Sequence, residues 1–468
     1  MTSTDRYDLA VVGSGPGGYV AAIRAAQLGL RVAIVEEDRL GGVCLNWGCI
    51  PSKALLTGAD LVETLRRHGD TFGVSAEGLR LDYGKLVDHS RKTADRMNRG
   101  VTSLMKKNRI EVVAGRGRLV GPHAVQVRTE EGERTVEAEC VLLATGSTEF
   151  VPQGLEVDGE RVLTSREALA SRRVPERLVV IGAGAVGVEF AYVYAMYGAR
   201  VTILEMADQM LPGADADVAA ALQREFRRKD IEVRLGTRFE ALKLANGSAR
   251  VFATRGGESE ELEAEQVLAA IGRRPRSDDL GLEELGVEVD RRGFVKVDAE
   301  LRTQVPSVRA IGDLVGGPLL AHKASEEGIA AVEYLAGVAR PPLDHRRIPA
   351  CVYAQPQVAW IGLTEAEARE RHGDGVRVGS FPFTASGKAV AAQHTAGFAK
   401  IVAEPRHGQI VGAHLVGHGA TELVAELTLA MTLEATTAEL ATTSHAHPTL
   451  SEAIMESALA AEGRAIHI

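Results

Sequence analysis

One glycine-rich pattern occurs twice in this 468-residue sequence, and the duplication restricts the possible folds more than any other feature. The first copy is Gly13-Ser14-Gly15-Pro16-Gly17-Gly18, and the second is Gly182-Ala183-Gly184-Ala185-Val186-Gly187. Each copy follows an apolar run and precedes an alanine-rich helical stretch and a second apolar run. Each then reaches an acid, Glu36 or Glu205, 18 residues after its last glycine. This order of strand, turn, helix, strand and acid is typical of dinucleotide-binding α/β units.

The chemistry of dinucleotide binding explains each position of the pattern. The first glycine permits a tight turn, the second lets a phosphate approach the backbone, and the third lets the helix pack closely on the strand. The helix N-terminus then offers free N–H groups and a partial positive charge to the pyrophosphate. Two unrelated glycine turns are the alternative, but they would not be expected to share the distance to the acid. The sequence therefore predicts two dinucleotide-binding units.

The residues around the two acids indicate which dinucleotides these are. Glu205 is followed by Met206, with no arginine nearby to receive a 2′-phosphate, so the second unit is predicted to prefer NAD over NADP. Glu36 is followed by Glu37 and Asp38, which are equally unfavourable for a 2′-phosphate and suit the adenosine ribose of FAD. The pattern alone does not distinguish a flavin from a nicotinamide dinucleotide.

Two cysteines, Cys44 and Cys49, follow the first glycine pattern at a spacing of five residues. The run from Cys49 to Leu56 is predicted to be helical, so the dipole and free N–H groups at its N-terminus would lower the pKa of Cys49. Zinc binding is the main alternative, but the sequence has no second cysteine pair or histidine cluster at zinc spacing. A thiol pair beside a nucleotide favours electron transfer between sulfur and a flavin. Cys140 and Cys351 are expected to be buried packing residues.

The C-terminal stretch Ser444–Glu452 contains a candidate base, His447. With Pro448 at the expected first position of a helix, the ring of His447 would fold back towards Glu452. A carboxylate on one ring nitrogen fixes the tautomer and leaves the other nitrogen as a base, which thiol–disulfide exchange requires. A simple helix cap is the alternative for this stretch on its own. His445 is expected to support the structure rather than act as the base.

The stretch Gly41–Lys53 resembles the redox-disulfide motif of the pyridine nucleotide–disulfide oxidoreductase family. Its Ile-Pro-Ser-Lys ending, and the sequence His-Pro-Thr-Leu-Ser-Glu at 447–452, are most similar to the family's dihydrolipoamide dehydrogenase branch. The resemblance extends over essentially the whole chain, from Asp8 to His467. Val43 and Trp47 differ from the residues that the family often has, and neither difference touches the chemistry of the thiols.

The resemblance implies a role for each candidate catalytic residue. Cys44 is the interchange thiol that forms a mixed disulfide with the substrate, and Cys49 is the sulfur that faces the flavin. Lys53 pairs with Glu189 near the flavin ring.

His447, with Glu452 behind it, serves as the base in the active site of the partner subunit, which implies an obligate homodimer. The implied reaction is the NAD-dependent oxidation of dihydrolipoyl groups to lipoyl disulfide through a Cys44–Cys49 disulfide and FAD. Such an enzyme is the dehydrogenase component of 2-oxo acid dehydrogenase complexes. Its partner is a lipoyl-bearing subunit of such a complex or of the glycine cleavage system.

The resemblance also implies the residues that bind the cofactors, and no metal ligand is among them. For FAD these are Gly13, Gly15, Gly18, Glu36, Lys53, Gly117, Thr145, Gly146, Ser147, Asp313, Leu319, Leu320, Ala321 and His322. For NAD they are Gly182, Gly184, Gly187, Glu189, Glu205 and Gly272.

The predicted fold class is α/β, with two Rossmann-like dinucleotide-binding domains and a C-terminal α+β dimerisation domain. By resemblance, the FAD-binding domain is split into residues 1–148 and 276–346 by an NAD-binding domain at 149–275. From Pro349 onward the sequence alternates between apolar and polar residues and then becomes helical, which predicts a separate interface domain at 347–468.

Composition narrows the partners and the location. A net charge of −9 argues against nucleic acid or an anionic membrane as a main partner. The longest apolar runs are too short to span a membrane. The first strand begins by Leu9, which leaves no room for a signal peptide. Four cysteines are too few for a secreted disulfide framework, so the cytoplasm is the expected location.

Other functions agree with parts of the sequence but not with all of it. An NAD(P)H-dependent reductase of another low-molecular-weight disulfide is the nearest, but such relatives usually prefer NADPH, which the surroundings of Glu205 disfavour. Mercuric reductase carries a C-terminal cysteine pair, and the tail after Glu462 has no cysteine. A binding module within a larger complex would not need a dithiol, a base and two nucleotide turns together.

Overall fold

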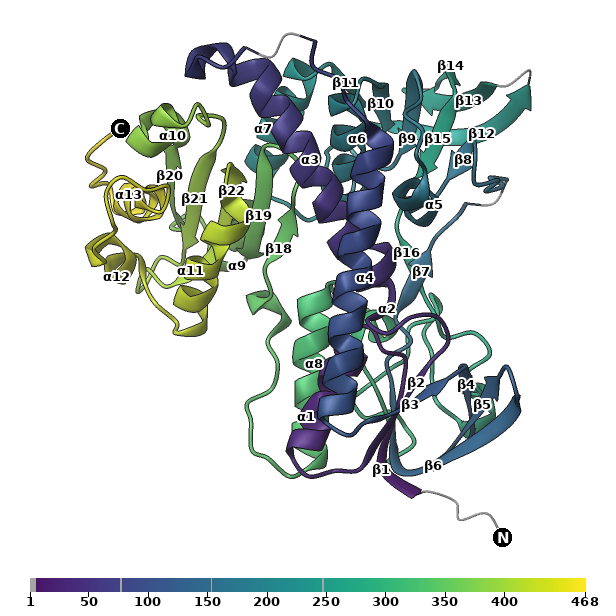
Figure 1. Cartoon of the computed structure of the whole chain (residues 1–468). Coiled ribbons are helices and arrows are strands. Elements are labelled where there is room, and N and C mark those ends of the chain that lie inside the picture. The colour runs from purple at the N-terminus through teal and green to yellow at the C-terminus, as the bar shows by residue number, and fades with distance from the viewer. Residues whose placement is uncertain (1–5, 76–77, 153, 246–247) are drawn as a thin grey trace. The chain divides into compact units, whose positions relative to one another are not determined.

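The computed structural model describes residues 6–75, 78–152, 154–245 and 248–468, coloured along the chain in Figure 1. The chain divides into two compact units. The first unit comprises Met1–Ala54, Asp88–Phe150 and Gly272–His345, and the second comprises Leu55–Val87, Val151–Ile271 and Arg346–Ile468. Two long helices, α3 (Cys49–His68) and α4 (Tyr83–Lys107), contain residues of both units. No helix among the described residues is long and apolar enough to cross a membrane.

A seven-stranded sheet forms the core of the first unit. Its strand order is β3-β2-β1-β6-β5-β4, and β17 also pairs with β6. The pairs β1–β2, β1–β6, β2–β3 and β6–β17 are parallel, whereas β4, β5 and β6 pair antiparallel. The strands are β1 (Arg6–Val12), β2 (Val32–Glu36), β3 (Glu111–Ala114), β4 (Arg116–Gly121), β5 (Ala124–Thr129), β6 (Gly132–Leu143) and β17 (Val308–Ala310). Because both faces of the parallel strands are buried, β1 from Leu9 to Val12 and β2 from Val32 to Val35 are continuously apolar.

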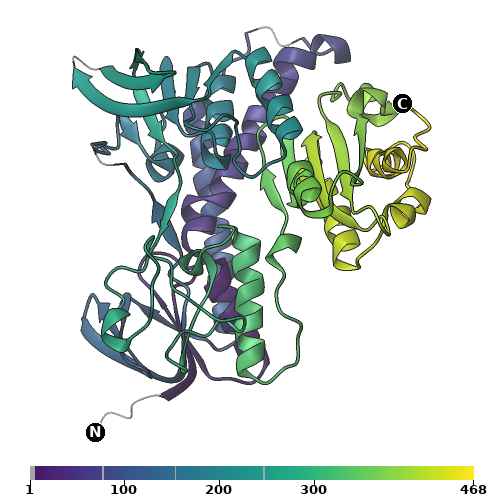
Figure 2. The ribbon, with the colours of Figure 1, turned by 180° about the vertical axis from the view of Figure 1, so that it is seen from behind.

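Helices α1 (Pro16–Gln27) and α8 (Ala321–Leu335) lie side by side in this unit, as Figures 1 and 2 show. A Cβ atom on Gly328 would lie 2.5 Å from the Gly17 carbonyl oxygen, so glycine lets the two backbones touch. The unit also contains α2 (Gly42–Trp47), the 3₁₀ turn η3 (Gly312–Val315) and a small antiparallel pair, β7 (Ser147–Glu149) with β16 (Arg273–Pro275). Helix α8 is therefore packed against the helix that begins at the first glycine turn.

The second unit contains a five-stranded parallel sheet in the order β11-β10-β9-β15-β8. Its strands are β8 (Val162–Leu163), β9 (Arg177–Ile181), β10 (Arg200–Leu204), β11 (Ile231–Arg234) and β15 (Gln266–Ala269). Helices α5 (Ser165–Ala170), α6 (Ala185–Met196) and α7 (Ala216–Arg228) belong to it, with an antiparallel sheet of β12 (Thr237–Ala245), β13 (Ser248–Arg255) and β14 (Glu258–Ala264). Helix α6, between β9 and β10, is apolar on all sides apart from Glu189, as expected of a helix that is buried almost completely.

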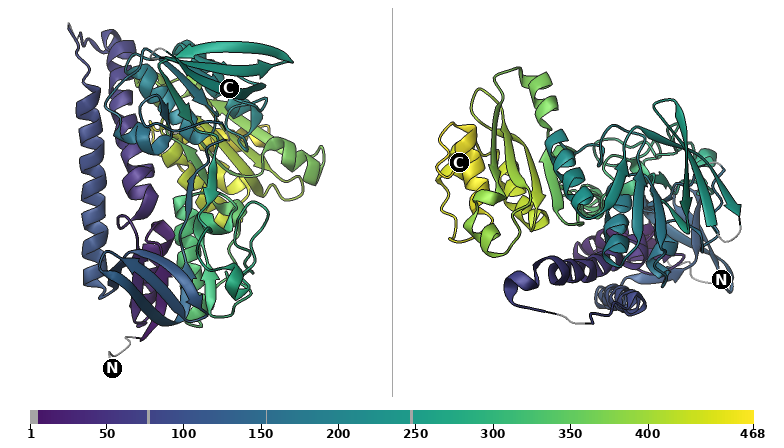
Figure 3. Two further views of the ribbon diagram at one scale, coloured as in Figure 1. Left: turned by 90° about the vertical axis from the view of Figure 1, so that its right-hand side faces the viewer. Right: turned by 90° about the horizontal axis from the view of Figure 1, so that it is seen from above.

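A five-stranded antiparallel sheet in the order β18-β19-β22-β21-β20 also lies in the second unit. Its strands are β18 (Ala350–Val352), β19 (Gln357–Gly362), β20 (Arg377–Pro382), β21 (Phe398–Ala403) and β22 (Ile410–Gly417). The helices are α9 (Glu365–His372), α10 (Gly387–Ala391), α11 (Ala420–Thr432), α12 (Thr437–Thr442) and α13 (Glu452–Ala461). Helices α11 and α13 pack on one face of this sheet (Figure 3), where Leu427 and Ile454 meet Ile401 and Leu415.

These sheets confirm the predicted fold class: two Rossmann-like sheets, the first built from both sides of an inserted segment, and a C-terminal α+β part. The predicted domain boundaries stay predictions. The division into compact units groups the second parallel sheet with the C-terminal sheet.

A buried ion cluster links these two sheets of the second unit. Lys400 on β21 has a side chain only 3% exposed, and its Nζ lies 2.9 Å from Asp215, 2.7 Å from Asp217 and 2.7 Å from Glu365. Burial raises the pKa of Asp215, but hydrogen bonds from the Glu365 backbone N–H and from Lys400 outweigh it and hold that pKa below its usual value. The hydrogen bond from Lys400 lowers the pKa of Glu365.

Replacing Lys400 with methionine is expected to lower the thermal midpoint by several degrees at pH 7, because it leaves the buried Asp215 carboxylate without its cation, at a cost of about 3 kcal/mol. Carboxylates with a depressed folded pKa stabilise the fold above their unfolded pKa of about 4 and lose that contribution as the pH falls through the folded value. The difference between wild type and variant should therefore shrink on acidification from pH 7 to below pH 4. Thermal denaturation monitored by circular dichroism measures it, with the exposed Lys388→Met as control. An unchanged difference across that range would contradict the role given to the cluster.

Candidate active site

The first glycine turn is closed by the acid at the end of β2. The Gly13 N–H donates to the Val35 carbonyl at 2.8 Å. The Glu36 carboxylate accepts from the backbone N–H of Ser14 through Oε2 and from that of Asp38 through Oε1, both at 2.9 Å. The Ser14 hydroxyl donates to Oε2 at 2.5 Å. Glu36 therefore holds the turn and lies at its edge.

The second glycine turn repeats this arrangement. The Gly182 N–H donates to the Leu204 carbonyl at 2.8 Å. Glu205 accepts from the N–H of Ala183 at 2.7 Å through Oε2 and from that of Ala207 at 2.8 Å through Oε1. The two copies of the sequence pattern therefore make the same hydrogen bonds between the glycine turn and the acid at the end of the following strand. The difference is the side chain of the residue after the first glycine, which is a serine in the first turn and an alanine in the second.

Within the turns, some glycine positions have no space for a side chain, whereas others do have space. A Cβ atom at Gly18 would lie 1.9 Å from the Gly13 carbonyl oxygen, and one at Gly187 would lie 2.0 Å from the Gly182 carbonyl oxygen. At Gly15, the N-cap of α1, no described protein atom lies within 4 Å of the Cβ position, and the N-cap has no side-chain hydrogen bond. The backbone at the α1 N-terminus is therefore open to a phosphate, which fits the pyrophosphate of a dinucleotide.

The helix that carries Cys44 begins directly on the first turn. The Gly41 N–H donates to the Ser14 carbonyl oxygen at 3.0 Å and lies 3.2 Å from the Ser14 hydroxyl oxygen. Gly41 is the left-handed N-cap of α2, with φ at +92°. A Cβ atom on Gly42 would lie 2.7 Å from Gly15 Cα. A dinucleotide bound at the first turn would consequently lie beside the cysteines.

Cys44 and Cys49 form a disulfide. Cys44 lies within α2, and Cys49 is the first residue of α3, so the helix begins where the sequence predicted it. Asn46 fixes α2 by donating through Nδ2 to the carbonyl oxygens of Leu40 at 3.0 Å and Gly42 at 2.9 Å. A Cys49 thiolate would be stabilised by the free N–H groups and the positive end of α3.

Trp47, which differs from the family's common residue, is held on both sides. Its indole N–H donates to Asp38 at 2.9 Å, and the guanidinium of Arg91 lies 4.4 Å from the ring centre. The tryptophan therefore anchors the end of α2 to the loop after Glu36.

Ser147, Arg273 and Asp313 are joined in one hydrogen-bonded chain. The Ser147 hydroxyl donates to Asp313 Oδ2 at 2.5 Å. Arg273 donates through Nε to the Ser147 hydroxyl at 2.7 Å and through Nη2 to the Ser147 carbonyl at 2.8 Å. Two predicted FAD residues from distant parts of the sequence thus meet.

Thr145, Gly146 and Gly117 also belong to the first unit. The Thr145 hydroxyl donates to the Arg276 carbonyl at 2.8 Å, and the Gly146 carbonyl accepts from the Arg276 N–H at 2.9 Å. Gly117 lies on β4, and a Cβ atom there would lie 3.1–3.2 Å from three core valines. Packing alone therefore favours glycine at 117, and its contact with FAD stays a prediction.

The remaining predicted FAD residues lie at the start of α8 and near the disulfide. Leu320 is the N-cap of α8, so Leu319–His322 form the entry to that helix. Lys53 lies four residues after Cys49 on α3. Glu189 lies on α6 in the second unit, 6% exposed, and accepts from the Tyr353 N–H at 3.0 Å. Since Lys53 and Glu189 belong to different units, their pairing stays a prediction, as does the place of Gly272 in the NAD site.

The candidate base is paired with its carboxylate in the second unit. His447 Nδ1 lies 2.9 Å from Glu452 Oε1, and the His447 side chain is 79% exposed. Glu452 Oε2 accepts from the Thr449 N–H at 2.8 Å. Burial raises the pKa of Glu452, but the hydrogen bonds from Thr449 and His447 outweigh it and hold that pKa below its usual value. His445 is buried and bonds Glu426 at 2.7 Å.

The helix near this base begins later than the sequence predicted. Helix α13 starts at Glu452 rather than at Pro448. Residues 448–451 form a turn instead, because the Thr449 hydroxyl donates to the Ala446 carbonyl at 2.6 Å and its N–H donates to Glu452. The predicted contact between His447 and Glu452 is nevertheless present, with Glu452 in the first turn of the helix.

Several residues of these sites were not predicted. Ser14 occupies a variable position of the glycine pattern, and only its hydroxyl next to an acid-bearing strand hinted at a role. Arg273 follows Gly272 at the end of an apolar strand, which is a weak signal. Lys323 and Glu327 on α8 are completely buried, and their charges gave no sign of this in the sequence.

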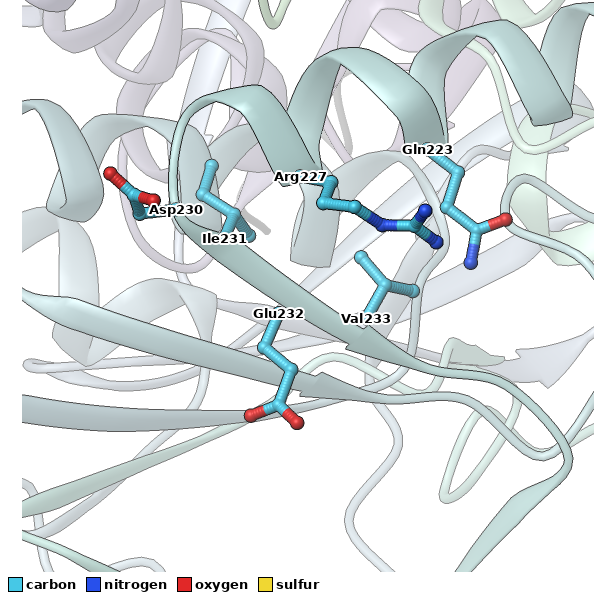
Figure 4. Close-up of a pocket in the computed structure, with 6 residues that line it drawn as sticks. All are labelled: Gln223, Arg227, Asp230, Ile231, Glu232 and Val233. Atoms are coloured by element: carbon cyan, nitrogen blue, oxygen red, sulfur yellow. The ribbon is translucent and has the colours of Figure 1, made fainter.

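A surface cavity of about 300 Å³ lies elsewhere, between α7 and β11 (Figure 4). Figure 4 shows Arg227 and Gln223 on the helix above Ile231, Glu232 and Val233 of the strand. None of the predicted site residues lines it.

Comparison with known proteins identifies the family to which the chain belongs. Residues 7–328 match the pyridine nucleotide-disulphide oxidoreductase family, and residues 348–458 match the dimerisation domain of the same family. The chain belongs to the pyridine nucleotide-disulphide oxidoreductase family. Its cofactors are accordingly FAD and NAD, and its C-terminal antiparallel sheet belongs to a dimerisation domain.

Individual members of the family match over nearly the full length. A dihydrolipoyl dehydrogenase of Chlorobaculum tepidum is 45% identical over 459 residues, which covers 98% of this chain and 97% of that protein. A dihydrolipoyl dehydrogenase of Zymomonas mobilis is 44% identical over 466 residues, covering 99% of both. Among solved structures, LpdA from Mycobacterium tuberculosis superposes with a TM-score of 0.90 at 28% identity, covering 97% of this chain and 98% of LpdA.

Proposed function

We propose that the chain oxidises dihydrolipoyl groups to lipoyl disulfide and reduces NAD⁺, as a dihydrolipoyl dehydrogenase. The observation that carries the proposal is the start of α2 on the first nucleotide-binding turn, which puts the Cys44–Cys49 disulfide beside that turn. The names of the full-length relatives support the same activity.

The disulfide accepts the substrate's electrons in two exchange steps. A substrate thiolate attacks Sγ of Cys44, which forms a mixed disulfide and releases Cys49 as a thiolate. The second substrate thiol loses its proton and attacks the substrate sulfur of the mixed disulfide, which closes the lipoyl ring and frees Cys44. The substrate loses two electrons and two protons, and the enzyme disulfide becomes a dithiol. FAD, when bound, supplies the two-electron redox chemistry that links this dithiol to NAD⁺.

His447 is the base that removes the substrate protons. Its Nδ1 faces the Glu452 carboxylate, so Nδ1 carries the ring proton and Nε2 is left to accept one. The low pKa of Glu452 keeps it ionised, which stabilises the imidazolium formed when His447 takes a proton. In the proposed homodimer each His447 serves the disulfide of the other subunit.

The two turns bind the two dinucleotides through the same kind of contact. At the first turn, the α1 N-terminus at Gly15 receives the FAD pyrophosphate and Glu36 the adenosine ribose. At the second turn, Glu205 receives the NAD ribose and repels a 2′-phosphate. Lys53 and Glu189 are assigned to the surroundings of the flavin ring.

The proposal includes the partners and the location. The dehydrogenase partner is a lipoyl-bearing subunit of a 2-oxo acid dehydrogenase complex or of the glycine cleavage system. The net charge of −9 supports neither nucleic acid nor an anionic membrane as a partner. The small number of cysteines, two of them redox-active, supports the cytoplasm.

The flavin-loaded enzyme is expected to reduce NAD⁺ with dihydrolipoamide. It should reduce NADP⁺ with dihydrolipoamide only very slowly, and it should barely reduce glutathione disulfide with NADPH. Because Glu205 repels a 2′-phosphate, kcat/KM for NAD⁺ should exceed that for NADP⁺ about a hundredfold or more. Steady-state assays at 340 nm measure kcat/KM for NAD⁺ and for NADP⁺. Glu205→Gln is expected to reduce the preference for NAD⁺ over NADP⁺, and Glu240→Gln, at an exposed position, is the control. Turnover of glutathione disulfide with inert dihydrolipoamide would instead support the reductase of another disulfide.

A further inference from the structure

Lys323 is a fully buried lysine whose ammonium group bonds both ends of one short turn. It lies on α8 with no exposed side-chain surface. Its Nζ donates to the carbonyl oxygens of Gly312 at 2.9 Å and Gly316 at 2.7 Å, and lies 3.0 Å from Glu327 Oε1. The two carbonyls are those at the beginning and just beyond the end of η3, so one ammonium group holds both ends of the turn.

Glu327 completes the contacts one helical turn further along α8. It is also fully buried, and its Oε2 accepts from the Gly312 N–H at 2.7 Å. Its Oε1 lies 3.0 Å from Nε2 of His345, whose side chain is 45% exposed. Gly312 is therefore fixed at both its N–H and its carbonyl group by one buried ion pair.

The backbone of this turn is of a kind that needs such support. Gly312 and Gly316 have φ values of +73° and +80°, and Gly317 follows at +71°. Successive glycines leave many backbone conformations accessible, so the turn would not keep one conformation by itself. Burying an ion pair costs free energy of desolvation, and apolar side chains would fill the same space without that cost. Apolar side chains, however, could not hold the three backbone groups.

The turn presents Asp313, a predicted FAD residue. Asp313 Oδ2 accepts from the Ser147 hydroxyl, while Oδ1 has no hydrogen-bond partner among the described residues. Helix α8 also touches α1 at Gly328 and Gly17, so the same helix adjoins the pyrophosphate-binding turn. A carboxylate with one oxygen bound and the other free fits a hydroxyl group of the flavin's sugar-alcohol chain.

We propose that Lys323 and Glu327 are positioning residues of the FAD site, which hold η3 so that Asp313 is already in place for the cofactor. The inference rests on the proposed role of Asp313 in binding FAD. The ion pair does not touch the reacting sulfur atoms, and its effect reaches the cofactor through the backbone of residues 312–316. The conformational entropy of the turn is therefore lost when the protein folds, so cofactor binding does not carry that cost.

The test uses Lys323→Met and measures FAD affinity and the mobility of the turn separately. We expect the dissociation constant of FAD, measured by titrating apoprotein and following the flavin absorbance change, to rise tenfold or more. We expect amide hydrogen exchange in a peptide covering residues 311–317 of the apoprotein to become at least tenfold faster, because the turn loses the ammonium group that holds two of its carbonyls, and Glu327 loses its ion-pair partner.

The chain offers a matched control in Lys400, another buried lysine held by carboxylates but in the second unit. Lys400→Met should destabilise the protein while leaving FAD affinity and exchange at 311–317 unchanged. His345→Ala keeps the buried pair and removes only the outer partner of Glu327, so it remains testable if Lys323→Met does not fold. It should raise the FAD dissociation constant about threefold, and His345→Gln should restore it.

Faster exchange at 311–317 with unchanged FAD affinity would overturn the inference, because the pair would then be structural only. Unchanged exchange in Lys323→Met, or unchanged FAD affinity in His345→Ala, would overturn it too. Failure of the proposed function looks different, since wild-type protein would then bind FAD but not oxidise dihydrolipoamide, or would not bind FAD at all.

Discussion

The Cys44→Ser enzyme is expected to lose dihydrolipoamide-dependent NAD⁺ reduction by about a thousandfold or more, because a serine hydroxyl at this position cannot form the mixed disulfide. It should still bind FAD, since the first nucleotide turn and Gly42 are unaltered. The measurement is kcat for NAD⁺ reduction together with the flavin absorbance spectrum of the purified variant. Serine at position 44 also leaves Cys49 as a free thiol, which titration with a thiol reagent under denaturing conditions would count.

Cys351→Ser is the matched control. Cys351 is a partly buried residue of β18, and neither its sulfur nor that of Cys140 is part of a disulfide. Its replacement should leave turnover within about twofold of wild type. Retention of more than a tenth of the activity in Cys44→Ser, with FAD bound, would exclude Cys44 as the residue that accepts the substrate.

Mixed dimers are expected to show that His447 of one subunit acts as the base for the disulfide of the other subunit. Alone, His447→Gln should slow turnover by about 10²- to 10⁴-fold, the usual contribution of a general base. A dimer of one Cys44→Ser chain and one His447→Gln chain contains one site with both residues intact if the base comes from the partner. If the base served its own chain, both sites of that dimer would be damaged.

Equal amounts of the two variants, reassorted and measured together, should therefore recover about a quarter of wild-type activity, because half the dimers are mixed and each has one intact site. Separately purified, differently tagged mixed dimers would give about half. Mixed dimers as inactive as the parents would refute the exchange of His447 between subunits. Glu452→Gln should lower activity less than His447→Gln and shift its dependence on pH, since the base would remain but lose the carboxylate that stabilises its charged form.

The sequence predicted what depends on local chemistry. Both glycine turns, with their acids at Glu36 and Glu205, follow from steric and hydrogen-bonding requirements contained within some twenty residues, and the structure has the same hydrogen bonds in both. The start of α3 at Cys49 was predictable for the same reason. The contact of His447 with Glu452 was predicted although the helix start was not, because the side chains are five residues apart with or without a regular first turn.

Contacts between distant residues could not be predicted in this way. Ser147 and Arg273 are 126 residues apart in the sequence, and Ser147 and Asp313 are 166 apart, yet they form one hydrogen-bonded chain. No periodic pattern connects them, because their meeting depends on how β7, β16 and η3 are placed by the sheet. Lys323 was unpredictable for another reason: charged residues on a helix are usually exposed, and only the fold shows that this one is enclosed.

The glycines of the two nucleotide turns also bear on how such a chain would evolve. At Gly18 and Gly187 any side chain collides with the backbone, so the fold itself keeps glycine there whether or not a nucleotide is bound. At Gly15 and Gly184 the fold leaves room, and only a bound phosphate would exclude a side chain. In a lineage that kept this architecture but no longer needed its cofactors, positions 15 and 184 would drift first, while 18 and 187 stayed glycine. Comparing the change at position 15 with that at 18, and the change at 184 with that at 187, therefore records how recently each nucleotide site was under selection.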